Sequence, residues 1–449
     1  MDDLIPEARI DIEAVIRECE AVLKQNNRGE HTSPQAKLYP HQWMWDSCFI
    51  AIGLRHLDHE RAAEELMSLL RGQWANGMLP NLIFSDAPGF KRDRSAWRSW
   101  INPYAPDTVA TSGVTSAPML AEAVVRVGEK LPKNQRNEFY HYMYEPLVRY
   151  HEWLYNDRDP HHEGLTLQIH PYEVGLDNSP PWMVQLREHH MPWWISLFNA
   201  LHLSGFAYLL RRDTRNVPHE QRMDNVDALL LWDVVRRLRR KGYDIEKILH
   251  RSLFMTEDLT FNCILIRANG HLRDIAAKIR RKVPDDLLVN MQRTEDALQY
   301  MYDEETHQYY SRDFITHKRL KNPTLATFMP LYAGTITHKR AEELVELLTN
   351  HKEYWLHHPV PSVPLSDPYF NTLCYWQGPT WVNTNWLIID GLKRYGFTEI
   401  AEELIQKTVD MVARAGAFEY FSPLDGKGLG APDFSWTAAL TIDLIQDNR

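Results

Sequence analysis

Apolar residues recur three and four positions apart along most of the chain, whereas the alternation typical of β-strands is scarce. This spacing predicts amphipathic helices that follow one another in pairs joined by short turns. We expect such pairs at residues 45–54 with 60–73, 115–127 with 136–155, 193–210 with 224–240, 325–331 with 339–349, and 381–395 with 399–415. Helices at residues 10–25 and 434–445 are expected to meet and to close the arrangement.

Long aperiodic segments, rich in Pro, Gly, Asn and aromatic residues, separate the pairs and cover residues 75–113, 156–191, 307–323, 351–379 and 416–433. Short turns at one end of paired helices and long loops at the other are typical of a toroid with its functional site on the loop face. The sequence therefore predicts an all-α (α/α)6 barrel. A solenoid is the alternative, but a solenoid repeats with a fixed period, and these spacers are irregular. We expect one domain, residues 1–449, with lid-like insertions near 85–101 and 156–191.

Charge and cysteine content narrow the partners of the chain. With 50 Lys and Arg against 60 Asp and Glu, the formal net charge of −10 disfavours nucleic acid and anionic membranes. The opening residues lack the basic flank and apolar run of a signal peptide, and no stretch is apolar enough to span a bilayer, so a cytoplasmic location is expected. Four cysteines, at positions 19, 48, 263 and 374, have no metal-binding spacing and are expected to be reduced thiols.

Aromatic residues are abundant outside the helical pattern, because the chain holds 15 Trp and 20 Tyr and many of them stand in loops. Such rings either pack the rim of a domain or stack on the apolar face of a sugar. In LYPHQWMWD, Tyr39, Trp43 and Trp45 stand beside the carboxylate of Asp46 at the start of a helix. Asp46 could simply cap that helix, but three rings beside one carboxylate favour sugar binding. A second aromatic wall is expected in YWQGPTWVNTNW, residues 375–386.

Two further carboxylates stand in aperiodic loops. Asp177 lies in GLDNSPPW, where Gly175 and the following prolines prevent a helix, although such a string is also a common turn. Glu419 lies among aromatic residues in GAFEYF, ahead of a glycine-rich loop, and an acid in that position is hard to explain by solvation alone. Paired carboxylates are the usual means of glycoside hydrolysis.

Taken in order, YPHQWMWD, GLDNSPPW, YWQGPTW and FEYFSPLDGKGLG followed by SWTAA resemble the bacterial members of glycoside hydrolase family 63, especially the mannosylglycerate and glucosylglycerate hydrolases. The resemblance spans residues 39–439 and implies an (α/α)6 barrel that cleaves a small α-glucoside or α-mannoside with inversion. It implies that Asp177 is the general acid and Glu419 the general base, and that neither a metal nor an organic cofactor takes part. The residues expected around the sugar are Tyr39, Trp43, Trp45, Asp46, Gln73, Asn81, Asn178, Trp182, Tyr375, Trp376, Gln377, Trp381, Tyr420 and Trp436.

The sequence also departs from that family in the region of the leaving group. Relatives have Arg where Gln377 stands and Gln where Phe434 stands, and NVPHEQRMDNVDAL replaces an Arg-Pro-Ser/Thr segment followed by Tyr. Fewer polar groups weaken the recognition of a carboxylate on the leaving alcohol, unless Arg187, Arg215 or Arg222 compensates. Neutral α-glucosides are therefore expected to be hydrolysed at least as well as glycerate conjugates.

Other functions stay open at this point. The same fold serves sugar isomerases, epimerases and phosphorylases, which would require a catalytic His pair or a phosphate site. A catalytically inactive carbohydrate-binding protein is the second alternative. The adjacent His pairs at 161–162, 189–190 and 357–358 do not have the spacing of a metal site. A small carbohydrate is the expected partner, and a homo-oligomer is not excluded.

Overall fold

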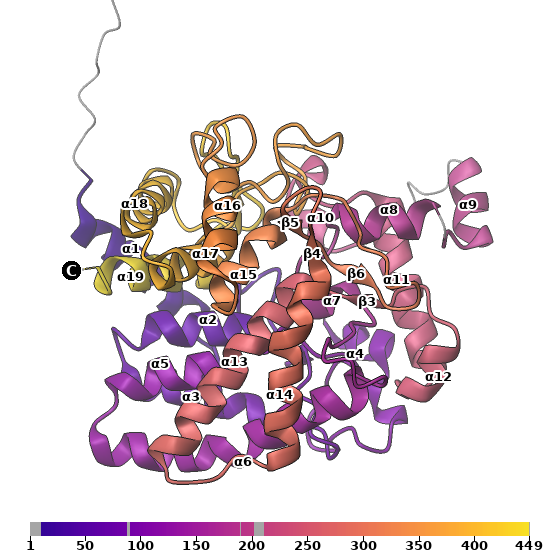
Figure 1. Ribbon diagram of the computed structural model, residues 1–449, viewed down its shortest axis with the longest axis horizontal. Helices are drawn as coiled ribbons and strands as arrows, with labels where there is room; N and C mark the ends of the chain where they lie inside the picture. The colour runs from indigo at the N-terminus through magenta and orange to yellow at the C-terminus, as the bar shows by residue number, and fades with distance from the viewer. Residues whose placement is uncertain (1–9, 88–89, 189, 202–210, 449) are drawn as a thin grey trace, which may run out of the picture.

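A ring of helices forms the core of the computed structural model, which describes residues 10–87, 90–188, 190–201 and 211–448. Six helices make the inner ring: α2 (Met44–Leu54), α5 (Leu120–Lys130), α13 (Leu259–Lys278), α15 (Met329–Ala333), α17 (Val382–Arg394) and α19 (Ser435–Gln446). Each contacts the next, and α19 packs on α2, so the ring closes on itself (Figure 1).

Six more helices surround this ring: α1 (Ile12–Asn26), α3 (His59–Leu69), α6 (Lys133–Arg158), α14 (Asp285–Ala297), α16 (His338–Leu348) and α18 (Thr398–Ala415). For example, α3 packs on α2 and α5, α6 packs on α5 and α13, and α1 packs on α19. Chain order therefore alternates between the outer and the inner layer. The prediction of an all-α (α/α)6 barrel is confirmed, including the closure of the ring by the first and last helices.

Burial explains why the two layers have different sequences. Every residue of α2 is buried, because an inner helix has neighbours on both sides as well as behind it. Gly53 belongs to this layer, and a Cβ atom there would lie 2.2 Å from the backbone oxygen of Ala439, so only glycine allows α2 and α19 to approach so closely. Outer helices such as α3 bury one face only and show the amphipathic pattern typical of surface helices.

One predicted helix pair does not belong to the ring. The residues predicted as 193–210 and 224–240 contain α9 (Trp193–Ala200) and α11 (Asn225–Arg240), with 202–210 outside the described residues. These helices contact each other, and α11 contacts α4, outside the ring. The ring position belongs to α13 and α14, which the pattern did not identify. Residues 259–266 of α13 are buried without interruption, which removes the amphipathic signal.

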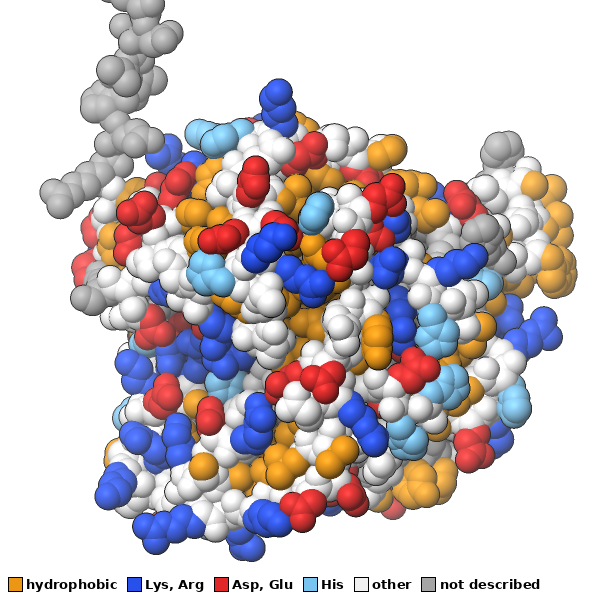
Figure 2. Space-filling model, in the orientation of Figure 1, with side chains coloured by type: hydrophobic (Ala, Val, Ile, Leu, Met, Phe, Trp, Pro, Cys, Tyr) orange, Lys and Arg blue, Asp and Glu red, His pale blue; other side chains and the backbone are white. Residues whose placement is uncertain are grey.

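The segment between α6 and α13 forms a large insertion at one side of the ring (Figure 1). It begins within the predicted insertion at 156–191 and continues to residue 258. Its helices are α7 (Pro171–Val174), α8 (Pro180–Glu188), α9, α10 (Asp213–Asn216), η4 (His219–Gln221), α11 and α12 (Ile245–His250). Figure 2 shows hydrophobic side chains at its outer edge over α9, where Trp193 is 77% exposed. The insertion therefore reaches both the loop face of the ring and the solvent.

Short antiparallel strand pairs connect the loops. They are β1 (Gln42–Trp43) with β2 (Leu82–Ile83), β3 (Thr256–Glu257) with β6 (Arg312–Asp313), β4 (Tyr302–Asp303) with β5 (Gln308–Tyr309), and β7 (Tyr420–Phe421) with β8 (Gly428–Leu429). The remaining elements are α4 (Lys91–Trp97), η1 (Leu70–Gly72), η2 (Ser99–Ile101), η5 (Leu298–Met301) and η6 (Leu325–Phe328). Within the described residues, no helix has the length and apolar character needed to cross a membrane.

Candidate active site

Several of the predicted site residues lie where inner helices begin. Trp43 directly precedes α2, Trp381 directly precedes α17, and Asp46 lies in the first turn of α2. Since the inner helices run side by side, loops that precede different helices meet at one mouth of the ring. Strand β7, which begins one residue after Glu419, joins them because Phe421 and Thr380 exchange backbone hydrogen bonds.

Glu419 is held by four hydrogen-bond donors. Its Oε1 accepts from the Tyr39 hydroxyl at 3.0 Å and from Nη1 of Arg222 at 3.0 Å. Its Oε2 accepts from Nη2 of Arg222 at 2.6 Å and from the backbone N–H of Ala431 at 3.0 Å. The carboxylate is only 2% exposed. Such a set of donors, with a bidentate guanidinium among them, fixes the orientation of a charged carboxylate.

Arg222 is the main contact that sequence reasoning did not place. It was considered for the leaving group, yet its side chain lies on Glu419 and is 2% exposed. Its guanidinium also lies 5.8, 5.2 and 5.9 Å from the ring centroids of Tyr39, Tyr375 and Tyr420. The two other arginines that were considered lie elsewhere. Arg187 pairs with Asp224 and Asp227, and Arg215 is exposed.

Asp177 is a half-buried carboxyl group on the loop between α7 and α8. Gly175 turns this loop with φ +84°, and a Cβ atom there would lie 2.4 Å from the Trp45 ring. Trp182 holds the loop from the other side, since its Nε1 donates to the Asp177 carbonyl at 2.9 Å. Burial, followed by the charge of Glu419, raises the pKa of Asp177 from 3.8 to about 7, whereas a hydrogen bond with Tyr375 lowers it.

Asp46 is a third carboxyl group of the site and is 4% exposed. Burial raises its pKa well above the usual value, and the charges of Glu419 and Asp177 raise it further. These effects place the three carboxyl groups within electrostatic reach of one another. A neutral carboxylic acid can donate one hydrogen bond and accept others, which suits Asp46 to contact with sugar hydroxyl groups.

The aromatic residues of the site fall into a front and a back layer. Tyr39, Trp43 and Tyr375 are only half-buried, so each keeps some exposed surface. Behind them, Trp376 and Trp381 stack with centroids 3.7 Å apart and are 1% and 0% exposed. Other predicted rings of the back layer are Trp45, Trp182, Tyr420 and Trp436, all buried. The back layer therefore positions the front layer and the carboxylates, and the front layer has surface available to a ligand.

Polar residues from three predicted motifs connect the loops. Trp376 donates its backbone N–H to Oδ1 of Asn178 at 3.0 Å, and Gln377 donates to the Asn178 carbonyl at 2.8 Å. Asn81 donates to the Tyr172 carbonyl, which ties the loop of α7 to the chain beside β2. Gln73 is not brought to this site, because its amide donates to the carbonyls of Gly77 and Pro146. Gln73 therefore braces the junction of η1 with α6.

Parts of the predicted lid at 85–101 are anchored to neighbouring elements. Its helix α4 packs on α11, and the Tyr243 hydroxyl donates to the Trp97 carbonyl. His41, beside the site, contacts Ser85 at 3.1 Å and Asp93 at 3.2 Å. These contacts fix the resting position of the segment, and its closure over a sugar stays a prediction.

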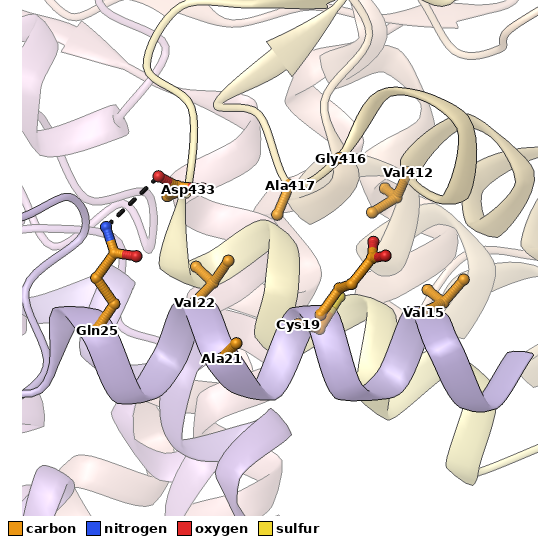
Figure 3. Close-up of a pocket in the computed structure, with 10 residues that line it drawn as sticks. Val15, Cys19, Ala21, Val22, Gln25, Val412, Gly416, Ala417 and Asp433 are labelled. Atoms are coloured by element: carbon orange, nitrogen blue, oxygen red, sulfur yellow. Dashed lines mark hydrogen bonds between the residues drawn. The ribbon is translucent and has the colours of Figure 1, made fainter.

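Two other features are separate from these carboxylates. A groove of about 280 Å³ lies along α1, between Val15, Cys19 and Val22 on one side and Gly416 and Ala417 on the other (Figure 3). A possible metal-binding trio, His56 with Asp443 and Asp447, lies at the end of α19 opposite to the site. Arg55 already pairs with both of these aspartates, and Trp386 donates to Asp443, so both oxygens of Asp443 and one oxygen of Asp447 have protein donors.

Comparisons with known proteins agree with this architecture. The family model of the mannosylglycerate hydrolase MGH1-like glycoside hydrolase domain matches residues 39–437. A mannosylglycerate hydrolase of Thermus thermophilus is 35% identical over 94% of this chain and 98% of its own length. A glucosylglycerate hydrolase of Mycolicibacterium hassiacum is 30% identical over 94% of this chain and 96% of its own.

A solved structure of a similar protein has the same fold. A crystal structure of a GH63 mannosylglycerate hydrolase from Thermus thermophilus, in complex with Tris and D-glycerate, superposes with a TM-score of 0.83. It is 34% identical and covers 96% of this chain and 99% of its own. A neutral trehalase from Saccharomyces cerevisiae, 15% identical with a TM-score of 0.58, shares the fold alone. The chain is therefore a glycoside hydrolase that belongs to the mannosylglycerate hydrolase MGH1-like family and is similar to enzymes of glycoside hydrolase family 63.

Proposed function

We propose that this enzyme hydrolyses the α-glycosidic bond of a small mannoside or glucoside whose leaving alcohol is glycerate, with inversion at the anomeric carbon. The relatives named above support the substrate class. Arg222 supports it further, because a guanidinium in the site suits a carboxylate ligand. The expectation of a neutral leaving group depends on Phe434 and Gln377. The contacts of these two residues give no comparable support for a neutral leaving group. Phe434 packs on Trp436, and Gln377 bonds to Asn178.

In the proposed mechanism, Asp177 is the general acid. Its pKa of about 7 keeps a large fraction of the carboxyl protonated near neutral pH, so a proton is ready for the glycosidic oxygen. Glu419 is the general base and takes a proton from the water that attacks the opposite face of the sugar. The sugar ring is held by Asp46 and by the half-buried rings of Tyr39, Trp43 and Tyr375. No step of this mechanism requires a cofactor.

One observation carries the proposal: a carboxyl group with a strongly raised pKa stands within electrostatic reach of a second, buried carboxylate that is held by four donors. A carboxyl group with a raised pKa beside a second carboxylate that is fixed by hydrogen bonds is an arrangement that suits an acid and base pair. An inverting pair leaves room for water and has carboxyl groups about 6.5–9.5 Å apart, whereas a retaining pair is roughly 5–5.5 Å apart.

Proton NMR of the first-formed sugar tests the proposal. Glucosylglycerate and mannosylglycerate are supplied as substrates, and the anomeric signals are followed before mutarotation equalises them. We expect the β-anomer first, and we expect Asp177→Asn and Glu419→Gln to lose activity by about 10²–10⁴-fold or more. Early appearance of the α-anomer, or a covalent sugar trapped on Glu419, would make Glu419 a nucleophile and contradict inversion.

A further inference from the structure

The carboxylate of Glu419 has no free acceptor position. A carboxylate offers about four lone-pair sites, two on each oxygen. Tyr39 and Nη1 of Arg222 occupy Oε1, and Nη2 of Arg222 and the N–H of Ala431 occupy Oε2. A general base must accept a hydrogen bond from water before it takes the proton. One of these donors therefore has to leave Glu419 before water can be activated.

Arg222 is the donor whose departure frees an acceptor position on each oxygen of Glu419, and an anion of the substrate can replace the counter-charge that it leaves. The N–H of Ala431 is backbone, and it belongs to a loop in which the Glu419 N–H also donates to the Ala431 carbonyl. The Arg222 side chain, by contrast, makes all its hydrogen bonds among the described residues to Glu419, and its buried Nε has no partner. The three tyrosine rings beside the guanidinium would keep it in a favourable cation–π environment as it turns.

The backbone of Arg222 is well anchored, so only the side chain has to move. Arg222 follows η4 in the insertion. Next to it, the Gln221 carbonyl accepts from the Tyr420 hydroxyl, and Oε1 of Gln221 accepts from the Gly430 N–H at 2.9 Å. The Arg222 carbonyl accepts from the Cys374 thiol at 3.7 Å. The guanidinium can therefore turn while the backbone of Arg222 stays in place.

We propose that Arg222 is a latch on the catalytic base: it occupies Glu419 in the free enzyme and turns to an anionic group of the leaving alcohol when substrate binds. A bidentate guanidinium leaves one carboxylate readily only when another anion replaces it. The exchange opens one side of Glu419 to the attacking water. A neutral leaving alcohol provides no such replacement, so it binds while the base stays occupied. This inference rests on the proposed function and adds that the leaving group switches the base on.

A matched pair of substrates tests the latch, glucosylglycerate and the corresponding glucosylglycerol, which differ by a carboxylate against a CH₂OH group. In the wild-type enzyme we expect kcat for the charged substrate to be about 100-fold higher, with a smaller difference in KM. In Arg222→Gln we expect this kcat ratio to fall below about 10, because the charged substrate no longer gains from the exchange of Arg222 between Glu419 and the leaving group. Arg222→Lys keeps the charge but cannot hold both oxygens, so kcat for the neutral substrate should rise.

Arg215→Gln is the matched control, because Arg215 is an exposed arginine of the same insertion. It should preserve the differences in kcat and in KM between the two substrates. Circular dichroism should show that all variants are folded. A kcat ratio unchanged in both Arg222 variants would overturn the latch. A loss of preference in KM alone would also overturn it, because Arg222 would then only bind the leaving group. Failure of the wild-type enzyme to hydrolyse either compound would instead contradict the proposed function.

Discussion

Replacement of Tyr375 by Phe should move the pH dependence of the enzyme in a direction that the structure fixes. The hydrogen bond from Tyr375 favours the ionised form of Asp177 and holds its pKa down, against burial and the charge of Glu419. Without the hydroxyl, the pKa of Asp177 should rise above about 7. The proposed acid works in its protonated form, so activity is lost as pH rises through this pKa. The alkaline limb of kcat/KM should therefore move to higher pH in Tyr375→Phe.

The size of this shift follows from the strength of one hydrogen bond to a charged group. Such a bond contributes about 1.5–3 kcal/mol, and one pKa unit corresponds to about 1.4 kcal/mol, which gives roughly one to two units. Asp177 is only half-buried and water can replace part of the bond, so we expect the lower end, about one unit.

Profiles of kcat/KM between about pH 5 and 9, at constant ionic strength, measure the limb directly. Tyr420→Phe is the matched control, because the Tyr420 hydroxyl donates to the Gln221 carbonyl instead of a carboxylate. Its alkaline limb should stay close to that of the wild type. If the limb in Tyr375→Phe stays in place or moves to lower pH, then either Asp177 is not the acid or the hydroxyl does not stabilise its ionised form.

Three further outcomes follow from the same geometry, and a fourth concerns the predicted lid. Glu419→Gln should lower stability by about 3–5 kcal/mol in denaturant melts, because the buried Arg222 loses its counter-charge. Asp177→Asn should leave stability unchanged or raise it above about pH 4, because the raised pKa of Asp177 makes its ionised form costly to the fold, and a clear loss would contradict this. Gly430→Ala should reduce kcat at least tenfold in initial-rate assays, because a Cβ atom would lie 2.6 Å from Oε2 of Glu419, and normal turnover would show that this oxygen is not needed in place. Hydrogen exchange should show that bound sugar protects the segment 85–101, and equal protection with and without sugar would count against a lid.

Much of the barrel could be predicted from the sequence because most of its helices have one buried and one exposed face. The outer helices α3, α16 and α18 show this pattern, and their predicted bounds agree with the structure within one residue at the starts. The inner helix α13 does not, since it is buried on nearly all sides in its first half. Helices α9 and α11 have the amphipathic pattern of ring helices, but they pack on each other in the insertion. Periodicity reports burial of one face and cannot report which partner covers it.

The site was predictable where its residues belong to a local motif. Asp177, Glu419 and the aromatic residues before α2 and α17 stand in loops whose composition already departs from the helical pattern. Arg222 stands in no such motif, and its contact with Glu419 joins positions 197 residues apart. The signal that remained was its place between a short turn and the helix capped by Asp224, which fixes the backbone but not the direction of the side chain. Gln73, in contrast, was assigned to the site and instead bonds to backbone carbonyls beside α6.

The origin of each site residue indicates which parts of the mechanism are free to diverge. Asp46 lies on ring helix α2, and Glu419 lies between α18 and α19, so the group expected to hold the sugar and the proposed base depend on the packing of the barrel itself. Asp177 and Arg222 come from the insertion, which contacts ring helix α13 through α7 and bonds to the loops of the site through Asn178, Gln221 and Arg222. Rigid elements fix the position of a carboxylate better than loops do, whereas a loop tolerates substitution. Substitutions in the insertion are therefore expected to affect Asp177 and Arg222 more directly than Asp46, which lies on a ring helix.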